Sequence, residues 1–339
     1  MQSPGLTDLQ VNGYAGVDFN DAALTPDAFD HALAVMLRSG VTTCLPTLIT
    51  ADETTLAHRL AALDAAVSAS VLGPFMVPGF HLEGPFLNPT NGYAGCHPAA
   101  AMIAPDPAVL SRLTRGLRHP VLLLTVAPEL DGAIPLIKWA CARGMVVAMG
   151  HTNADAAITI KAVQAGVMLS THLGNALPQP QPKFLNPLMV QLARDELHAS
   201  FIADGIHIPP DALQVLLRAK GLSRSILVTD ATAAAATEPG LYRLAGMTIQ
   251  RTADGSVLIP GSATLAGSAL CLDQAVRNLI AWNLADPGTA LSMASTRPAA
   301  LIAQALARSG LAAEAGCVTW NQDYWPIDVT YGGRRVWSA

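Results

Sequence analysis

Short apolar runs alternate with longer stretches of mixed apolar and polar residues over most of the chain, from Leu6 to about Asp230. A strand covered on both faces is apolar throughout, whereas a covering helix is apolar on one side only, so this alternation is typical of parallel strands joined by crossover helices. The runs that we interpret as strands are Leu6–Val11, Val41–Pro46, Phe75–Leu82, Val121–Val126, Met145–Gly150, Val167–His172, Leu197–Ala203 and Ser225–Asp230. Strand–helix units of this number over roughly 200–250 residues most simply close into a (β/α)8 barrel, a TIM-like α/β fold. A doubly wound open sheet is the alternative, and it is disfavoured because no GxGxxG follows the first run.

The stretches between the runs carry helix signals of their own. Thr25 followed by Pro26 is typical of an N-cap and a first helical position, and Gly40 ends the same helix just before the second strand. Thr50 and Glu53 have the spacing of a capping box that would open the next helix. Local signals and the overall pattern therefore predict the same fold.

The pattern changes after the last of these runs. Tyr242–Ile249 and Ser256–Ile259 predict a β-hairpin with its turn at Asp254-Gly255, inserted before the final helices. The elements expected beyond it are helices near Ser268–Leu284 and Pro287–Ala307 and short strands within Cys317–Val336. We therefore predict a barrel domain over residues 1–310, with a hairpin insertion near 241–260, and a reduced small β-domain over 311–339.

Composition narrows the kind of partner. The 339 residues carry a net charge of −5 without any run of Lys or Arg, so nothing indicates binding to nucleic acid or to an anionic membrane. The apolar runs are far shorter than the roughly 18–20 residues that a membrane span requires. Met1–Gly5 shows no basic segment followed by an apolar one, and we expect a cytoplasmic protein. The five cysteines are scattered without a CxxC pair, which argues against disulfides, and the expected partner is a small molecule.

Ionisable side chains stand where several predicted strands end, which is where the reactive groups of a barrel enzyme lie. Glu83, His151 and His172 end three different runs, and two imidazoles with one carboxylate make the ligand set of a catalytic zinc site. Three protein ligands leave one position for a water, as metal-assisted hydrolysis requires. A single histidine at a strand end is more often structural, so the prediction rests on the joint placement of the three.

A carboxylate for proton transfer is expected at the same end of the barrel. Asp230 ends the last run, where it could take a proton from the water and return it to a leaving nitrogen. Its simpler interpretation is an N-cap of the following turn. His81 precedes Glu83 on the same run, and we expect a structural role for it.

The ends of the predicted strands carry short motifs in a fixed order. They are Asp8–Gly13, His81–Phe86 with Gly95-Cys96-His97 downstream, Gly150–Ala154, Thr171–Ala176, Ala203–His207, Val228–Ala231 and Leu265–Ser268. Together they closely resemble the N-acetylglucosamine-6-phosphate deacetylase family of the amidohydrolase superfamily, over about Gly5 to Ser268. The resemblance implies a metal-dependent deacetylase that hydrolyses the acetamide of an N-acetylhexosamine 6-phosphate, first of all N-acetylglucosamine 6-phosphate, to acetate and an amino sugar phosphate.

The resemblance also implies roles at the matching positions. It assigns a metal ion to Glu83, His151 and His172, general acid–base catalysis to Asp230, and contact with the amide carbonyl to His97. The residues that it places against the substrate are Gln10, Cys96, His207, Leu265, Ala266 and Gly267, with Asn175 and the backbone of Ala176 near the phosphate.

Two positions depart from the family's pattern. Gln10 and Asn12 stand where many amidohydrolases have two histidines, so we predict a single divalent metal ion per subunit, with Zn2+ favoured by two imidazoles and one carboxylate. The arginine that the family places after the fourth strand-end motif is absent, and Lys183 is the nearest cation. Lys183 is expected to contact the phosphate, although a lysine cannot make the bidentate contact of an arginine.

Three functions stay open. The first is the deacetylase just described, the second is an amidohydrolase that acts on a non-phosphorylated N-acyl compound, and the third is a barrel that binds ligands without turnover. The complete set of Glu83, His151, His172 and Asp230 argues against the third, because a binding protein has no evident need of all four. We further expect a homodimer, in which Lys183 could reach a phosphate across the interface.

Overall fold

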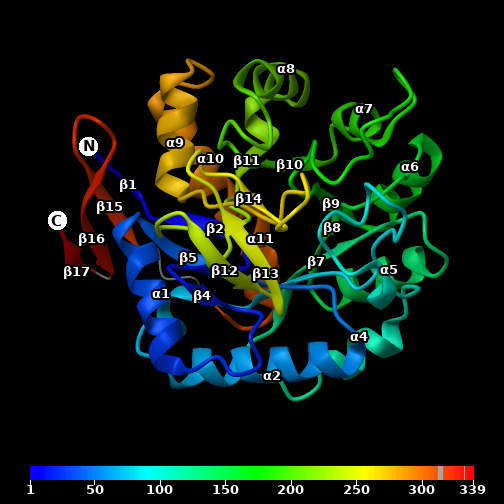
Figure 1. The fold of residues 1–339 in the computed structure, drawn as a ribbon, viewed down its shortest axis with the longest axis horizontal. Coiled ribbons are helices and arrows are strands. Elements are labelled where there is room, and N and C mark those ends of the chain that lie inside the picture. Colours follow the sequence, from blue (N-terminus) through cyan, green and yellow to red (C-terminus); the bar gives the residue numbers. More distant parts are fainter. Residues whose placement is uncertain (312–315, 332) are drawn as a thin grey trace.

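The predicted strands all form and pair into one parallel sheet that curves into a barrel (Figure 1). The computed structural model describes residues 1–311, 316–331 and 333–339. The barrel strands are β2 (Leu6–Val11), β5 (Val41–Ile49), β6 (Phe80–Glu83), β7 (Val121–Val126), β8 (Val146–Met149), β9 (Val167–Ser170), β10 (His198–Phe201) and β11 (Ser225–Leu227). Each pairs in parallel with the next, so the predicted (β/α)8 barrel is confirmed.

The barrel closes where the segment after β11 meets β2. Val11 and Ala231 form a parallel bridge. Two hydrogen bonds flank it, one from the Asp230 amide to the Gln10 carbonyl (2.9 Å) and one from the Asn12 amide to the Ala231 carbonyl (2.7 Å). The closure sets the side chains of Gln10 and Asn12 beside Asp230, although they lie more than two hundred residues apart in sequence.

Helices cover the outside of the barrel (Figure 1). They are α1 (Pro26–Arg38), α2 (Glu53–Ala69), α3 (Gly73–Met76), α4 (Pro107–Leu113), α5 (Ala133–Ala142), α6 (Ala156–Ala165), α7 (Pro187–Leu192), α8 (Pro210–Lys220), α9 (Leu272–Ala281), α10 (Pro287–Ala294) and α11 (Thr296–Arg308), with short 3-10 turns at Ala99–Ala101 and Leu222–Arg224. Every residue of β5 and β7 is buried, as expected of strands covered on both faces. The core lies between the sheet and the apolar sides of these helices.

Two predicted local features are wrong. Phe75 and Met76 belong to α3 rather than to a strand, because Pro74 sits in the first turn of a short helix and the strand starts only at Phe80. The N-cap of α2 is Asp52, whose Oδ1 accepts a hydrogen bond from the Thr55 amide (2.9 Å). The Thr25 cap of α1 is confirmed, since its hydroxyl accepts from the Ala28 amide.

The insertion after the barrel is a three-stranded sheet of β12 (Gly240–Leu244), β13 (Met247–Arg251) and β14 (Val257–Leu258). The predicted strand Tyr242–Ile249 is itself a hairpin, because Ala245 and Gly246 both take positive φ and turn the chain. The turn at Asp254-Gly255 exists, but it joins β13 to β14. The predicted helix Pro287–Ala307 is likewise divided at Ser295 into α10 and α11.

A separate four-stranded sheet contains both ends of the described chain. It is formed by β1 (Gln2–Pro4), β15 (Cys317–Trp320), β16 (Pro326–Tyr331) and β17 (Arg334–Ser338), while β3 (Gly13–Tyr14) and β4 (Val17–Asp18) form a short ribbon near the barrel mouth. Trp320 is buried, and its Nε1 donates to Ser3 Oγ (2.8 Å). The predicted domain boundary at residue 310 falls beside residues 312–315, which lie outside the described residues. In the part of the chain that is described, no helix has the length and apolar character of a membrane span.

Candidate active site

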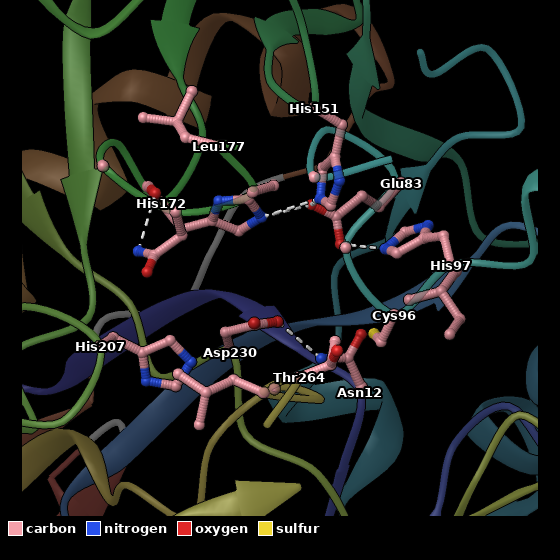
Figure 2. Close-up of a pocket in the computed structure, with 18 of the residues that line it drawn as sticks. Asn12, Glu83, Cys96, His97, His151, His172, Leu177, His207, Asp230 and Thr264 are labelled. Carbon is pink, nitrogen blue, oxygen red and sulfur yellow. Dashed lines mark hydrogen bonds and ion pairs between the residues drawn. The ribbon is translucent and has the colours of Figure 1, made fainter. Parts of the chain in front are cut away.

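A cavity of about 460 Å3 opens at the carboxyl end of the barrel (Figure 2). The predicted residues that line it are Glu83, Cys96, His97, His151, His172, Asn175, Ala176, His207, Asp230, Leu265 and Gly267. They come from the ends of β6, β8, β9, β10 and β11 and from two loops, so the order of strands in the barrel gathers residues that are far apart in sequence.

Glu83, His151 and His172 bring three ligand atoms together. Nε2 of His172 lies 3.0 Å from Oε1 of Glu83 and 3.2 Å from Nε2 of His151. Nε2 of His151 is 3.5 Å from the same carboxylate oxygen. Ligands held at 2.0–2.1 Å around a tetrahedral ion are ~3.3 Å from one another. The three separations are therefore those of ligands that share one small ion.

The donor chemistry of this cluster also fits a metal. Nδ1 of His151 lies 2.8 Å from the carbonyl oxygen of Tyr93 and donates to it, which leaves a lone pair on Nε2. That lone pair and the carboxylate of Glu83 both face Nε2 of His172 inside a buried space. Burial alone would raise the pKa of Glu83, but its interactions with the neighbouring imidazoles outweigh burial and hold the pKa well below its usual range. The cluster is thus rich in electron pairs and suited to a cation.

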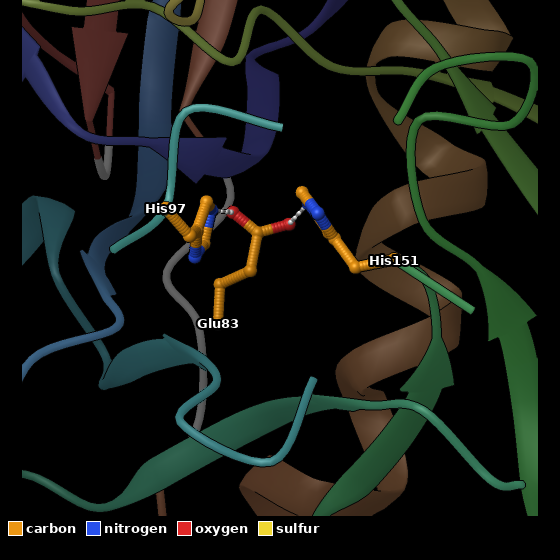
Figure 3. A group of neighbouring side chains, drawn as sticks. All are labelled: Glu83, His97 and His151. Atoms are coloured by element: carbon orange, nitrogen blue, oxygen red, sulfur yellow. Dashed lines mark ion pairs between the residues drawn. The ribbon is translucent and has the colours of Figure 1, made fainter. Parts of the chain in front are cut away.

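His97 is a fourth ligand-type side chain beside Glu83. Its Nε2 lies 3.6 Å from Oε2 of Glu83, and its Nδ1 lies 2.9 Å from Oγ1 of Thr50. Figure 3 shows Glu83 between His97 and His151, with one carboxylate oxygen toward each, and the ligand atoms of these three lie within 4.8 Å of one another. Burial lowers the pKa of His97 to about 4, so its imidazole is neutral near pH 7. The predicted metal set contains His172 in place of His97, and the two sets share Glu83 and His151.

Asp230 lies across the cavity from His97 (Figure 2). Its Oδ1 accepts hydrogen bonds from Asn12 Nδ2 (2.7 Å) and Gln10 Nε2 (3.3 Å), whereas no described residue is bonded to Oδ2. Burial, together with the charge of Glu83, raises the pKa of Asp230 to about 6. No helix starts at this residue, so the carboxylate does not serve as the N-cap that was the simpler interpretation. One oxygen is fixed and the other is free to exchange a proton.

The side-chain amide of Gln10 lies between the carboxylates of Glu83 and Asp230 and is bonded to both. Its Nε2 donates to Oε1 of Glu83 (2.9 Å) as well as to Asp230, and its Oε1 accepts from Thr171 Oγ1 (3.2 Å). The Thr171 bond fixes the orientation of the amide, so its NH2 group faces the carboxylates. Gln10 was expected against the substrate, but it does not line the cavity.

Several site residues adopt a left-handed backbone. The φ angles of His151, His172 and Asp230 are +50°, +27° and +50°, and Ala176 has +51°. Residues other than glycine pay about 1–3 kcal/mol for such a conformation, which persists only where the surrounding structure holds it. These residues follow strand ends, and the turn after each strand aims the side chain into the cavity.

The remaining predicted residues divide between the cavity wall and its surroundings. Nδ1 of His207 lies 2.6 Å from Oδ2 of Asp204, so its Nε2 is left for the cavity. Ala266 is buried behind the wall formed by its two neighbours, and it does not itself line the cavity. Lys183 is exposed and also lies outside the lining. Within the described residues, the cavity wall contains no Lys or Arg.

Sequence reasoning missed four residues that hold the site in place. Asn12 and Thr50 orient Asp230 and His97, Tyr93 accepts from His151, and Asp204 holds His207. Asp204 could have been found, because it stands three residues before His207 in the same motif. Tyr93 acts through its backbone carbonyl, which no side-chain pattern reveals. His81 is buried between Thr47 and Thr125, in agreement with a structural role.

Comparisons with known proteins agree with this geometry. Residues 1–304 match the model of the Amidohydrolase family. The N-acetylglucosamine-6-phosphate deacetylase of Mus musculus is 33% identical over 99% of this chain and 83% of its own. The N-acetylgalactosamine-6-phosphate deacetylase of Escherichia coli O157:H7 is 32% identical over 88% of this chain and 77% of its own. A solved structure of a mutant N-acetyl-D-glucosamine-6-phosphate deacetylase from Mycobacterium smegmatis, in complex with N-acetyl-D-glucosamine-6-phosphate, has a TM-score of 0.86 at 30% identity and covers 99% of this chain and 86% of that one.

The class of protein follows from the barrel, the cluster at its carboxyl end and the family match. The chain is an amidohydrolase, a hydrolase of amide C–N bonds built on a (β/α)8 barrel. Within that class it belongs to the N-acetylglucosamine-6-phosphate deacetylase family, which its motifs resemble.

Proposed function

We propose that this protein removes the acetyl group from an N-acetylhexosamine 6-phosphate, with N-acetylglucosamine 6-phosphate as the first candidate. The observation that carries the proposal is the placement of Asp230 in one cavity with Glu83, His151 and His172, in a chain of this family. The test is acetate release from a panel of N-acetyl sugars and their 6-phosphates. The name of the Escherichia coli relative makes N-acetylgalactosamine 6-phosphate the second substrate to assay.

The metal belongs to Glu83, His151 and His172, whose ligand atoms lie 3.0–3.5 Å apart. When bound, a divalent ion lowers the pKa of a water ligand and polarises a carbonyl, and two imidazoles with one carboxylate favour Zn2+. This chain's own residues supply the rest. Oδ2 of Asp230 takes the proton of the attacking water and passes it to the amide nitrogen, while Asn12 and Gln10 hold Oδ1. His97 is neutral and close enough to Glu83 to contact the acetyl carbonyl in the same space.

The active protein should contain one equivalent of divalent metal per chain. A second ion beside Glu83 and Asp230 would need lone pairs from Gln10 and Asn12 on the side of these carboxylates, but both amides turn their NH2 groups to that side. Elemental analysis of protein purified without chelators measures the content. Two equivalents in fully active protein would contradict this prediction.

The phosphate of the substrate should matter strongly even though no Lys or Arg lines the described cavity wall. Asn175 and the amide of Ala176 can each donate to a phosphate oxygen, and hydrogen bonds to a charged group are stronger than neutral ones. Removing the phosphate should lower kcat/KM by roughly 10²-fold, about 3 kcal/mol. The measurement compares an N-acetyl sugar with its 6-phosphate on the wild-type protein. Equal values for the two would favour the non-phosphorylated N-acyl substrate instead.

We further propose a homodimer in which Lys183 contacts the phosphate bound by the other copy. Lys183 is exposed, and the next two side chains, Phe184 and Leu185, are 75% and 88% exposed, a large apolar surface beside the cavity loop. Lys183→Ala should reduce the difference in kcat/KM between an N-acetyl sugar 6-phosphate and the same sugar without the phosphate. Lys161→Ala, an exposed lysine on α6, is the matched control. A monomer in sedimentation experiments with an unchanged phosphate preference in Lys183→Ala would contradict this arrangement.

A further inference from the structure

A second cavity, of about 680 Å3, lies beside the barrel mouth and shares no lining residue with the active-site cavity. Its walls come from the end of α1, the first turns of α9, the end of β13 with the turn that follows, and the four-stranded sheet. Figure 1 shows α1, α9 and the four-stranded sheet on the same side of the barrel. Nothing in the proposed deacetylation uses this cavity.

Arg251, the last residue of β13, forms no ion pair with a described residue. Its Nε and Nη1 are buried without a hydrogen-bond partner among the described residues. A buried donor without a partner destabilises the folded state, and more so where the group is charged. Arg277 on α9 has one such nitrogen, because its Nε is also buried without a hydrogen-bond partner among the described residues. Its Nη1 and Nη2 are engaged by Asp273 (2.7 Å) and Gln274 (2.9 Å).

Each acidic side chain that lines the cavity already interacts with at least one described residue. Asp273 is paired with Arg277, and Asp204 holds His207 and two backbone amides. Asp254 accepts from the Ser256 amide (3.2 Å) and from the Thr252 hydroxyl. Arg38, exposed at the end of α1, lines the same cavity and forms no ion pair with a described residue. The wall therefore contains guanidinium groups with incomplete hydrogen bonding, while Oδ1 of Asp273 is a buried carboxylate oxygen that also lacks a hydrogen-bond partner among the described residues.

We propose that this second cavity binds a small oxyanion, a phosphate or a carboxylate, through Arg251 with Arg277 and Arg38 beside it. Guanidinium groups present donors in a geometry suited to either anion, and charge-assisted hydrogen bonds are the strong ones. Trp325, which Arg277 covers at 3.5 Å from its ring centroid, and Trp337 add an aromatic border where an organic anion can place its carbon skeleton. The volume suits a small metabolite better than a macromolecule.

The test is calorimetric titration of the whole protein with inorganic phosphate, glycerol 3-phosphate and gluconate. The variants are Arg251→Met, which keeps the aliphatic stem, and Arg243→Met as the matched control. Arg243 is exposed on the neighbouring strand β12, where its guanidinium donates a hydrogen bond to Thr248 Oγ1 (3.1 Å) and to no other described side chain. Wild type and Arg243→Met should bind at least one probe, with Kd at least about tenfold lower than in Arg251→Met. The three probes distinguish a free phosphate from an organic phosphate and from a carboxylate.

Any binding heat that remains when Arg251→Met is titrated comes from another site, such as the substrate cavity. The difference in binding between wild type and Arg251→Met therefore tests the second cavity independently of the deacetylase assignment. Arg251→Met should also melt at the same temperature as wild type or higher without anion, because two buried donors without a hydrogen-bond partner have been removed. Equal binding by wild type and Arg251→Met, or no binding of any probe, would overturn the proposal. A clear loss of thermal stability in anion-free Arg251→Met would do the same, since it would give Arg251 a purely structural role.

Discussion

Asp230→Asn is expected to lower kcat by at least about 10²–10⁴-fold, the usual contribution of a positioned acid–base group, while the fold and the metal content stay unchanged. The substitution is nearly isosteric. The amide oxygen can take the place of Oδ1 and keep the hydrogen bonds from Asn12 and Gln10. The amide nitrogen then occupies the free position, where it cannot accept a proton. Steady-state acetate release and elemental analysis of the same preparation provide the measurement.

The matched control is Asp254→Asn, which makes the same chemical change on an exposed turn. Asp254 bonds only within its own turn, to Thr252 and Ser256, and lies outside the active-site cavity. It should therefore leave kcat unchanged. Retention of more than a tenth of wild-type kcat in Asp230→Asn would assign the proton transfer to another residue.

The fold could be predicted from the sequence because buried parallel strands are apolar along their whole length. Val121–Val126 was predicted with the bounds that the structure shows, and it is buried at every position. Errors occur where the apolar run does not end with the strand. Phe75 extends such a run, but Pro74 starts a helical turn there, and Phe75 is 58% exposed. An apolar run alone does not distinguish a strand from one helical turn.

The site could be predicted to a similar depth, because barrel topology places strand ends together whatever their spacing in sequence. Glu83, His151, His172 and Asp230 were found by this rule and do lie around one cavity. The residues that orient them could not be found in this way. Thr50 has the spacing of a helix cap from Glu53, yet its hydroxyl lies beside His97, forty-seven residues away. The sequence alone does not decide whether this hydroxyl caps a helix or bonds to a distant histidine, because the folded geometry determines which of the two lies within reach.

Gln10 illustrates a second limit. The sequence shows that an amide stands where many relatives of this superfamily have an imidazole, which predicts the loss of a second metal. It does not show that the amide bridges Glu83 and Asp230. Two carboxylates in one buried space repel each other, and a donor that contacts both lowers that cost. In this structure Gln10 lies outside the cavity lining and contacts the two carboxylates that face the cavity.

His172→Ala is expected to remove the metal and the activity together, and comparison with His97→Ala makes this a test of the ligand set. Nε2 of His172 is 3.0 Å from the nearer oxygen of Glu83, whereas Nε2 of His97 is 3.6 Å from the other oxygen. Losing a ligand should weaken metal binding by more than the roughly 10–100-fold that loss of an outer-shell partner costs. His97→Ala should retain the metal and lose turnover, because in the proposed mechanism it removes only the group that contacts the acetyl carbonyl.

Metal affinity is measured by competition with a chelator, and kcat is measured on each variant after reconstitution with Zn2+. His81→Asn is a useful control for the loss of a buried imidazole near the site. The imidazole of His81 forms hydrogen bonds with Thr47 and Thr125 and is not among the described side chains whose ligand atoms form the cluster. It should keep full metal content. If instead His97→Ala lost the metal and His172→Ala retained it, the ion would belong to Glu83, His97 and His151, and His172 would be left to position the substrate.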